Sequence, residues 1–251
     1  MSNPQTSLHV LLSQIEAYAS KLSSEHQAYW SLHKLRFAQA LRLVKTLKRE
    51  LPIDSPILDI GNSFQTLLFA DGFPKTPVDT LGYFDRTYHL QKPSRHFEYD
   101  LNQAIEKATW PTPPSSKYGI ITFLEVIEHL YTSPLQVLPF LKTFLEPSGF
   151  LVIQTPNAAA LKKRLKLLRG VNPYEKIRLD RSCPGHFREY TPDELSKMSA
   201  ECGLLTRKVE YNNFTIDGSK WDRLWDRLAN YLPRSFKSGF TMILQKPSEE
   251  I

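Results

Sequence analysis

The chain lacks three features that would take it out of the class of soluble globular proteins. Its longest apolar runs are far shorter than the roughly 20 residues that a membrane-spanning helix needs. The first ten residues contain no basic stretch followed by an apolar core, so we expect no secretory signal. Cysteine is scarce: Cys183 and Cys202 are the only two. We therefore expect a cytoplasmic protein whose thiols stay free.

Internal repeats and low-complexity tracts are also absent. The 251 residues, 41% hydrophobic and 23% charged, suffice for one large domain or a domain with an appendage. The net charge is +6 and the sequence pI is about 9.2, a balance compatible with nucleic acid, an anionic substrate or a membrane surface.

The positive charge is concentrated in one part of the chain. Between Lys162 and Arg188 there are nine Lys or Arg residues and two acids, Glu175 and Asp180. A solvated helix face is the simpler interpretation, and a binding patch is the alternative.

The first fifty residues have helical spacing of apolar side chains. One segment carries Leu8, Leu11, Leu12, Ile15, Tyr18 and Leu22, and a second, from about residue 27 to 51, carries Trp30, Leu35, Ala38, Leu41, Val44 and Leu47. We predict that residues 1–52 form a helical cap and that residues 53–251 form the main domain.

From Ser55 onward, strand and helix patterns alternate. Strands are expected at about 56–60, 78–84, 96–99, 118–123, 150–154, 205–211 and 240–245. Helices are expected at 65–73, after the cap signal Ser133-Pro134, and after the similar signal Thr191-Pro192. This order predicts an α/β protein with a three-layer, mostly parallel sheet, in which the last pair of strands is partly antiparallel.

An insert before the last strand has an apolar helical face. Its members are Trp221, Leu224, Trp225, Leu228 and Leu232. Core packing is the favoured interpretation, and a lid, a dimer contact or an interfacial helix is the alternative.

Acidic side chains follow several of the predicted strands. Asp59 and Gly61 end the first, Asp100 follows the third, and Glu125 follows the fourth, in the run YGIITFLEVIEHL at 118–130. In open α/β sheets, ligands bind beyond the carboxyl ends of the strands. Acids along this edge suit a cationic or hydroxyl-rich ligand, such as a ribose or an adenine amine.

The chain resembles the seven-stranded S-adenosylmethionine-dependent methyltransferases. The matching motifs occur in the family's order: ILDIG at 57–61, FEYDLN at 97–102, FLEVIEHL at 123–130, LEPSGFLVIQTPN at 145–157 and GHFREYTPDEL at 185–195. They resemble most the branch of ubiquinone-biosynthesis-type and other small-molecule methyltransferases. The resemblance implies a doubly wound, Rossmann-like sheet that ends in a reversed hairpin.

The resemblance also implies roles for particular residues. Asp59, Gly61 and Asn62 would flank the methionine part of the cofactor. Asp100 and Leu101 would contact its adenine. The end of the fourth strand would line the cofactor cleft through Phe123, Leu124 and Glu125.

Two positions depart from the family pattern. The acid that binds the ribose falls near Gly82, so Asp85, or Asp79 in another register, would have to replace it. The family's glycine-rich loop retains only its first glycine, in the run Asp59-Ile60-Gly61-Asn62-Ser63-Phe64-Gln65. Asn tolerates left-handed backbone, so a turn can still form.

The cluster of Glu125, Glu128 and His129 has three interpretations. It shapes the cofactor pocket; or His129, with Glu128 beside it, is a catalytic general base for a hydroxyl acceptor; or the three, with His186, bind Mg²⁺ or Mn²⁺. The last arrangement is similar to the Glu-x-x-Glu-His motif of small-RNA 2′-O-methyltransferases.

The favoured function is methyl transfer from S-adenosylmethionine to a small molecule, at oxygen before nitrogen or carbon. Segments 158–190 and 213–235 and the N-terminal helices would surround the acceptor, with lining residues Tyr174, His186, Arg188 and Tyr190. The alternatives are a noncatalytic binding protein of the same fold and, less favoured, a metal-assisted RNA 2′-O-methyltransferase. The sequence indicates no oligomeric state.

Overall fold

A computed structural model describes residues 16, 24–88, 90, 94–179, 185–213, 231 and 233–248. The predicted apolar faces at residues 8–22 and 221–232 lie outside the described residues, as does Cys183. Cys202 is described and carries a free thiol. None of the described helices has both the length and the apolar character needed to cross a membrane.

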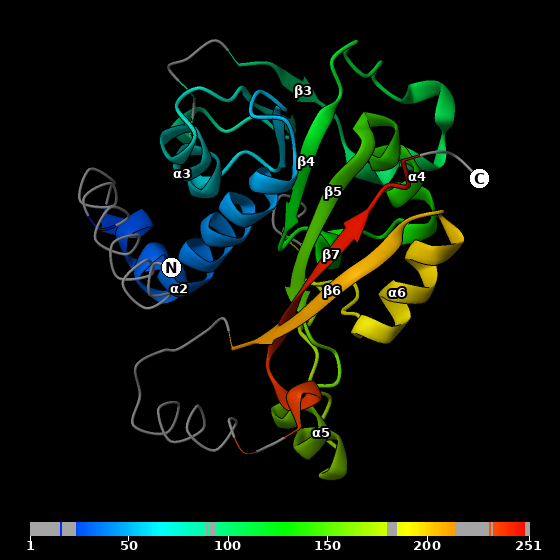
Figure 1. Cartoon of the computed structure of the whole chain (residues 1–251). Coiled ribbons are helices and arrows are strands. Elements are labelled where there is room, and N and C mark those ends of the chain that lie inside the picture. Colours follow the sequence, from blue (N-terminus) through cyan, green and yellow to red (C-terminus); the bar gives the residue numbers. More distant parts are fainter. Residues whose placement is uncertain are drawn as a thin grey trace.

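The centre of the protein is a seven-stranded sheet with the order β3-β2-β1-β4-β5-β7-β6 (Figure 1). The strands are β1 (Ile57–Ile60), β2 (Val78–Gly82), β3 (His96–Glu98), β4 (Tyr118–Leu124), β5 (Leu145–Pro156), β6 (Leu205–Asn212) and β7 (Gly239–Gln245). Neighbouring strands from β3 to β5 are parallel, and β7 is antiparallel to both β5 and β6. This confirms the predicted mostly parallel sheet with a reversed terminal hairpin.

Helices cover both faces of the sheet. The α-helices are α2 (Ser24–Leu47), α3 (Phe64–Gly72), α4 (Pro134–Phe144), α5 (Leu161–Leu168) and α6 (Pro192–Glu201). The 3-10 helices are η1 (Lys48–Glu50), η2 (Arg86–Tyr88), η3 (Leu101–Ile105), η4 (Lys107–Thr109), η5 (Ile127–His129) and η6 (Arg234–Phe236). Figure 1 shows α2 and α3 on one side of the sheet and α4 and α6 on the other.

Two apolar cores follow from the alternation of side chains along the strands. Ile57 and Ile120 point into the core under α2 and α3, where Leu41 and Val44 also pack. The adjacent strand residues contribute to the opposite core, with Phe140 and Phe144 of α4. The N-terminal helix therefore shares a core with the sheet.

Side-chain caps begin three of the helices. Thr191 and Glu194 form the predicted capping box of α6, and Ser133 accepts a hydrogen bond from the Leu135 amide at the start of α4. Ser63 and Thr66 form a capping box at α3. Each cap satisfies amide groups that the first turn of a helix leaves without partners.

The fifth strand begins earlier than we predicted. Its first residues pair with the start of β4, and the register then shifts between Tyr118 and Ile120. The expected turn at 147–149 is present as an irregularity within β5, where Ser148 has φ +62°. A bulge therefore replaces the predicted loop before the strand.

Candidate functional site

The loop after β1 is held by side chains in place of the family's later glycines. Gly61 has φ +84°, a conformation that glycine adopts without strain. Asn62 Nδ2 donates a hydrogen bond of 2.9 Å to the carbonyl of Asp85, and Ser63 caps α3. The turn therefore keeps a glycine at the position with positive φ, and the side chains of the next two residues hold the loop in place.

Asp59 is almost fully buried at the end of β1. Its two carboxylate oxygens each accept a hydrogen bond of 2.6 Å, from Thr66 of α3 and Thr122 of β4. Burial raises the pKa of Asp59 to about 7, although both hydrogen bonds act to lower it. Asp59 thus joins β1, α3 and β4 directly beneath the loop.

A cavity of about 690 Å³ lies beyond the carboxyl ends of β1, β2 and β3. Its wall includes Gly61, Gly82, Tyr83, Asp100, Leu101 and His129. Its volume is typical of cofactor sites.

The two strand ends beside this cavity present different groups. Gly82, where the family acid was expected, has φ +137°, a conformation that L side chains rarely adopt. The next residue is Tyr83, whose pKa is raised by burial and then by the neighbouring Asp100. Asp100 also caps η3 by accepting a hydrogen bond of 2.9 Å from the Asn102 amide. A tyrosine–aspartate pair therefore occupies the edge where an acid alone was expected.

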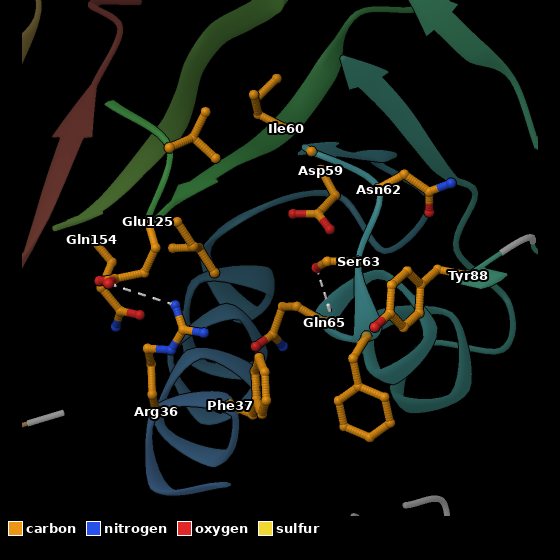
Figure 2. Close-up of a pocket in the computed structure, with 14 residues that line it drawn as sticks. Arg36, Phe37, Asp59, Ile60, Asn62, Ser63, Gln65, Tyr88, Glu125 and Gln154 are labelled. Carbon is orange, nitrogen blue, oxygen red and sulfur yellow. Dashed lines mark hydrogen bonds and ion pairs between the residues drawn. The ribbon is translucent and has the colours of Figure 1, made fainter. Parts of the chain in front are cut away.

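A smaller cavity has a volume of about 170 Å³, and Arg36, Asn62 and Glu125 are among the residues that line it (Figure 2). Gly61 lines both cavities. Four residues of its wall each hold a buried polar atom for which the described residues supply no hydrogen-bond partner. These atoms are Asn62 Oδ1, Gln65 Nε2, Glu125 Oε1 and Gln154 Oε1. Buried polar groups normally have partners, so this wall is built for a polar ligand that has both donors and acceptors.

Glu125 and Arg36 face each other across the smaller cavity. Arg36 Nη1 lies 3.8 Å from Glu125 Oε2, and Arg36 is 5% exposed. Glu125 has φ +55°, which is uncommon outside glycine, and this turns its side chain off the end of β4. Burial raises the pKa of Glu125, while Arg36 and then Lys163 act to lower it.

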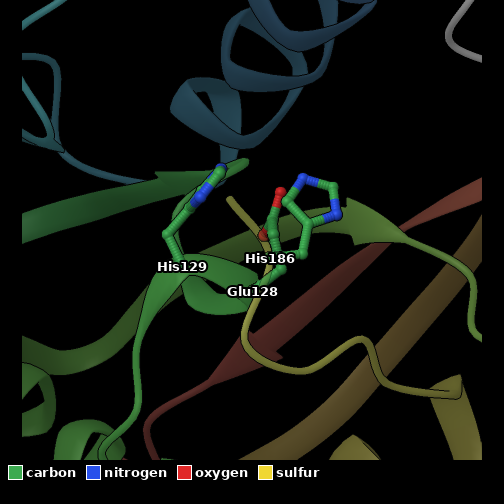
Figure 3. Close-up of side chains that lie close together, drawn as sticks. All are labelled: Glu128, His129 and His186. Atoms are coloured by element: carbon green, nitrogen blue, oxygen red, sulfur yellow. The ribbon is translucent and has the colours of Figure 1, made fainter. Parts of the chain in front are cut away.

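Glu128, His129 and His186 form a second polar group (Figure 3). Each offers one potential ligand atom, and these atoms all lie within 4.8 Å of one another. Glu128 is fully buried and accepts a hydrogen bond of 2.9 Å from Thr155 through Oε2, while Oε1 has no partner among the described residues. Burial, and then the Glu125 carboxylate, raise the pKa of Glu128 well above its usual range. The fourth predicted metal ligand, Glu125, is not part of this group.

His129 is oriented by the backbone. Its Nδ1 lies 2.9 Å from the carbonyl oxygen of Gly185, which can only accept, so Nδ1 carries the proton. In the neutral ring, Nε2 therefore has a free lone pair. The His186 ring meets that of His129 edge to face at 4.8 Å, and burial followed by His129 lowers the pKa of His186.

A lysine and a glutamate complete this polar region. Lys163 of α5 forms an ion pair with Glu189, whose other carboxylate oxygen lies 3.2 Å from His186 Nδ1. Burial lowers the pKa of Lys163 to about 8, against the attraction of Glu128 and Glu125.

The remaining predicted site residues lie outside both cavities. Phe123 is fully buried in the core, and Tyr190 is a core residue that bridges to Asn157. Arg188 is exposed and pairs with Glu194 of the α6 capping box. The Lys163 ammonium lies 5.9 Å from the centroid of the Tyr174 ring. Of the four predicted acceptor residues, the structure brings only His186 next to His129.

Neither candidate for the ribose acid lines a cavity. Asp85 is exposed on the turn that Asn62 holds through its carbonyl. Asp79 is buried within β2, where it accepts hydrogen bonds from Tyr118 and Arg95. The sequence pattern did not identify Arg36, Tyr83, Lys163 or Gln154. Of these four residues, only Arg36 could have been noticed in the sequence, because it is a charged residue within an apolar helical pattern.

A family model described as "Methyltransferase domain" matches residues 32–209. The chain belongs to this methyltransferase family. With the seven-stranded sheet and its reversed hairpin, it is a class I, S-adenosylmethionine-dependent methyltransferase by family and fold. The match begins within α2 and ends within β6, so it includes both cavities and the Glu128–His129 pair. No curated protein sequence matches the chain.

Solved structures share the methyltransferase fold at low identity. A SAM-dependent methyltransferase from Archaeoglobus fulgidus gives a TM-score of 0.55 at 15% identity, over 85% of this chain and 94% of that one. A SAM-dependent methyltransferase from Methanosarcina mazei gives a TM-score of 0.52 at 14% identity, over 81% of this chain and 98% of that one. At these identities the likeness is one of fold.

The two cavities of the methyltransferase suit the two halves of S-adenosylmethionine. The larger one is lined by Asp100 and Leu101, and the smaller one presents both hydrogen-bond acceptors and donors. An added Cβ at Gly61 would approach Val126 Cγ2 at 3.6 Å, so this junction of the cavities is narrow but open.

Proposed function

We propose that this methyltransferase transfers the methyl group of S-adenosylmethionine to an oxygen of a small-molecule acceptor, with His129 as the general base. The observation that supports this most is the orientation of His129. Its Nδ1–H is committed to the Gly185 carbonyl, and its ring lines the larger cavity, so Nε2 is available for a proton.

The proposed binding mode assigns the methionine group to the smaller cavity. Glu125, Gln154 and Asn62 supply oxygens for the ammonium, and Arg36 with Gln65 supplies donors for the carboxylate. Tyr83 and Asp100 hold the ribose and adenine in place of the missing acid at Gly82. These contacts place the reactive sulfur close to Gly61, where the cavities meet.

S-adenosylmethionine, when bound, supplies an electrophilic methyl group on a positively charged sulfur. With the methyl donor bound, His129 would take the proton of the acceptor hydroxyl at Nε2 as the methyl group is transferred to the acceptor oxygen. The Glu128 carboxyl group lies within 4.8 Å of both imidazoles, and its ionisation would stabilise the imidazolium that results. Alignment of donor and acceptor supplies the rest of the rate.

A test measures release of S-adenosylhomocysteine with catechol and phenol as acceptors, for the wild type and for His129→Gln. Loss of a positioned general base costs about 10²–10⁴-fold in rate. We expect kcat to fall by about a hundredfold or more while affinity for S-adenosylhomocysteine, measured by calorimetry, is kept. Equal turnover by the variant would exclude His129 as the general base. If the wild type does not bind the cofactor, S-adenosylmethionine is excluded as the methyl donor. Binding without turnover would favour the noncatalytic alternative.

A divalent cation is a second candidate at the same site, favoured by the grouping of Glu128, His129 and His186 and by the partnerless Glu128 Oε1. One carboxylate and two imidazoles suit Mn²⁺ or Mg²⁺, which would position and acidify an acceptor hydroxyl. Calorimetric titration with Mn²⁺ tests this without activity. Binding by the wild type and by the surface control Glu106→Ala, but not by Glu128→Ala/His129→Ala, would support it. Identical titrations for all three would reject it.

A further inference from the structure

The chain from Leu161 to Leu179 exposes an unusual number of large apolar side chains. We call this region, α5 with the residues that follow it, the 161–179 surface. No residue of α5 is buried, and exposure reaches 82% at Leu168. The exposed apolar members are Leu165, Leu167, Leu168, Val171, Tyr174, Ile177 and Leu179. Apolar groups gathered in this way commonly mark an interaction site.

Basic residues interleave with these apolar ones. The segment holds seven Lys or Arg residues and a single acid, Glu175, which pairs with Arg178. Within α5, Leu161, Leu165 and Leu168 recur at helical spacing and form one stripe. Lys162, Lys166 and Arg169 follow the same spacing one residue later, so a basic stripe runs alongside the apolar one.

Polar contacts hold α5 to the body of the protein. Lys163 reaches inward to Glu189 and to the carbonyl of Asn157 at 3.1 Å. Arg164 donates to the carbonyl of Ala159 and lies over the Phe236 ring at 4.9 Å. Lys163 and Arg164 therefore attach the helix to the protein through polar contacts, and the leucines of α5 are not buried in a core.

We propose that the 161–179 surface docks onto an anionic lipid surface. Leucines beside a lysine and arginine stripe are the composition of helices that lie in the membrane interface, with the apolar side chains inserted and the cations on anionic headgroups. A nucleic acid of the same charge would be held better by several aromatic stacking platforms, whereas six of the seven exposed large apolar residues here are aliphatic and one, Tyr174, is aromatic. The charge of the segment is complementary to the membrane.

The surface continues to the edge of the larger cavity. Ile177 and Arg178 line that cavity together with His129 and Phe187. Docking would therefore place the cavity mouth next to the lipid headgroups. The proposal rests on exposure and charge alone and does not depend on methyl transfer.

The experiment is flotation of the full chain with vesicles. Vesicles of equal parts phosphatidylglycerol and phosphatidylcholine are compared with vesicles of phosphatidylcholine alone. We expect binding to the anionic vesicles and its weakening by high salt. Equal partition into both vesicle types, or into neither, would overturn the proposal. Retention on polyuridylate without vesicle binding would instead assign the charge to nucleic acid.

Two variants separate the charge from the apolar contribution. Lys162→Glu/Lys166→Glu/Arg169→Glu removes three attractions of about 1 kcal/mol each, so we expect partition to fall about a hundredfold or more. Leu165→Ser/Leu168→Ser removes two inserted side chains, and we expect a fall of at least about tenfold. The matched controls are Arg49→Glu/Lys75→Glu/Arg207→Glu and Leu205→Ser, all at exposed positions elsewhere. Unchanged partition in the leucine variant, or equal losses in the controls, would overturn the proposal.

Discussion

At the scale of single residues, Asp59 lines a cavity and also holds neighbouring elements of the fold together. It lines the smaller cavity, yet both of its carboxylate oxygens accept hydrogen bonds from buried threonines. Burial holds its pKa at about 7 against an ordinary value of 3.8. Between these values the folded state binds a proton that the unfolded chain releases. The free energy of unfolding therefore falls as pH rises from about 4 to 7.

Replacement of Asp59 by Asn should remove this dependence. In the wild type, the Asp59 carboxyl group should lower the unfolding free energy by on the order of a few kcal/mol between pH 4 and pH 7. We expect this decrease to be absent in the variant, because the amide does not titrate. Urea denaturation at several pH values between 4 and 7 measures it. Asp71→Asn, at an exposed position, should leave the slope unchanged. A variant with the wild-type slope would mean that other carboxyl groups control the pH dependence.

Residue patterns could locate part of the candidate site but not all of it. Gly61, Asp100, Leu124 and His129 line the cavities because each follows a strand whose end is visible in the sequence. Arg36 could not be assigned, because its approach to Glu125 depends on how a distant helix crosses the sheet. Tyr83 was missed because it follows β2, whereas its neighbour Asp100 follows β3.

At the scale of elements, β4 depends on a glycine whose role is steric. A Cβ at Gly119 would lie 2.7 Å from Ser55 Cβ and 2.8 Å from Glu146 Oε1. Contacts this short do not occur between real Cβ atoms, so the neighbouring segments must move apart. Gly119 thus allows the chain before β1 to pack against the start of β4.

We expect Gly119→Ala to lower the free energy of unfolding by about 1–3 kcal/mol, the usual cost of overpacking. Equilibrium denaturation in urea measures the change. Ser55→Gly/Gly119→Ala should recover part of the loss, because the closest contact is with the Ser55 Cβ. A Gly119→Ala protein as stable as the wild type would show that the strand shifts without cost.

Elements with strong local signals were predictable, and irregular ones were not. The alternation of apolar runs with capped helices located six strands and helices α3, α4 and α6 to within a few residues. The start of β5 was missed because Pro147 and Gly149 are typical of a turn, whereas pairing with β4 carries the strand through them. A tertiary contact decides that boundary.

At the scale of the whole molecule, α2 connects the core of the sheet with the smaller cavity. Leu41, Val44 and Leu47 pack into the core beneath the sheet, and Arg36 and Phe37, about one turn before Leu41, line the smaller cavity. The predicted boundary at residue 52 stays a prediction, although the described helix and the sheet share one core. Cofactor binding should therefore stabilise both together.

We expect S-adenosylhomocysteine at a hundred times its dissociation constant to raise the unfolding free energy by about 2.7 kcal/mol. For a chain of this size, that corresponds to a rise in Tm of about 5–10 °C. Arg36→Met should reduce the shift, because a charge-assisted hydrogen bond contributes about 1.5–3 kcal/mol to binding. Arg36→Lys should keep more of it. Equal shifts in differential scanning fluorimetry for all three proteins would exclude Arg36 from cofactor binding.

The left-handed backbone at Glu125 costs folding stability, whereas the proposed function requires the Glu125 carboxylate. A non-glycine residue at φ +55° costs about 1 kcal/mol, which Glu125→Gly would recover unless the lost contact with Arg36 outweighs it. Selection for thermal tolerance alone would then favour the substitution that removes the carboxylate from the cofactor cavity. If selection for both heat resistance and turnover retains Glu125, the proposed activity requires this residue despite its cost in stability.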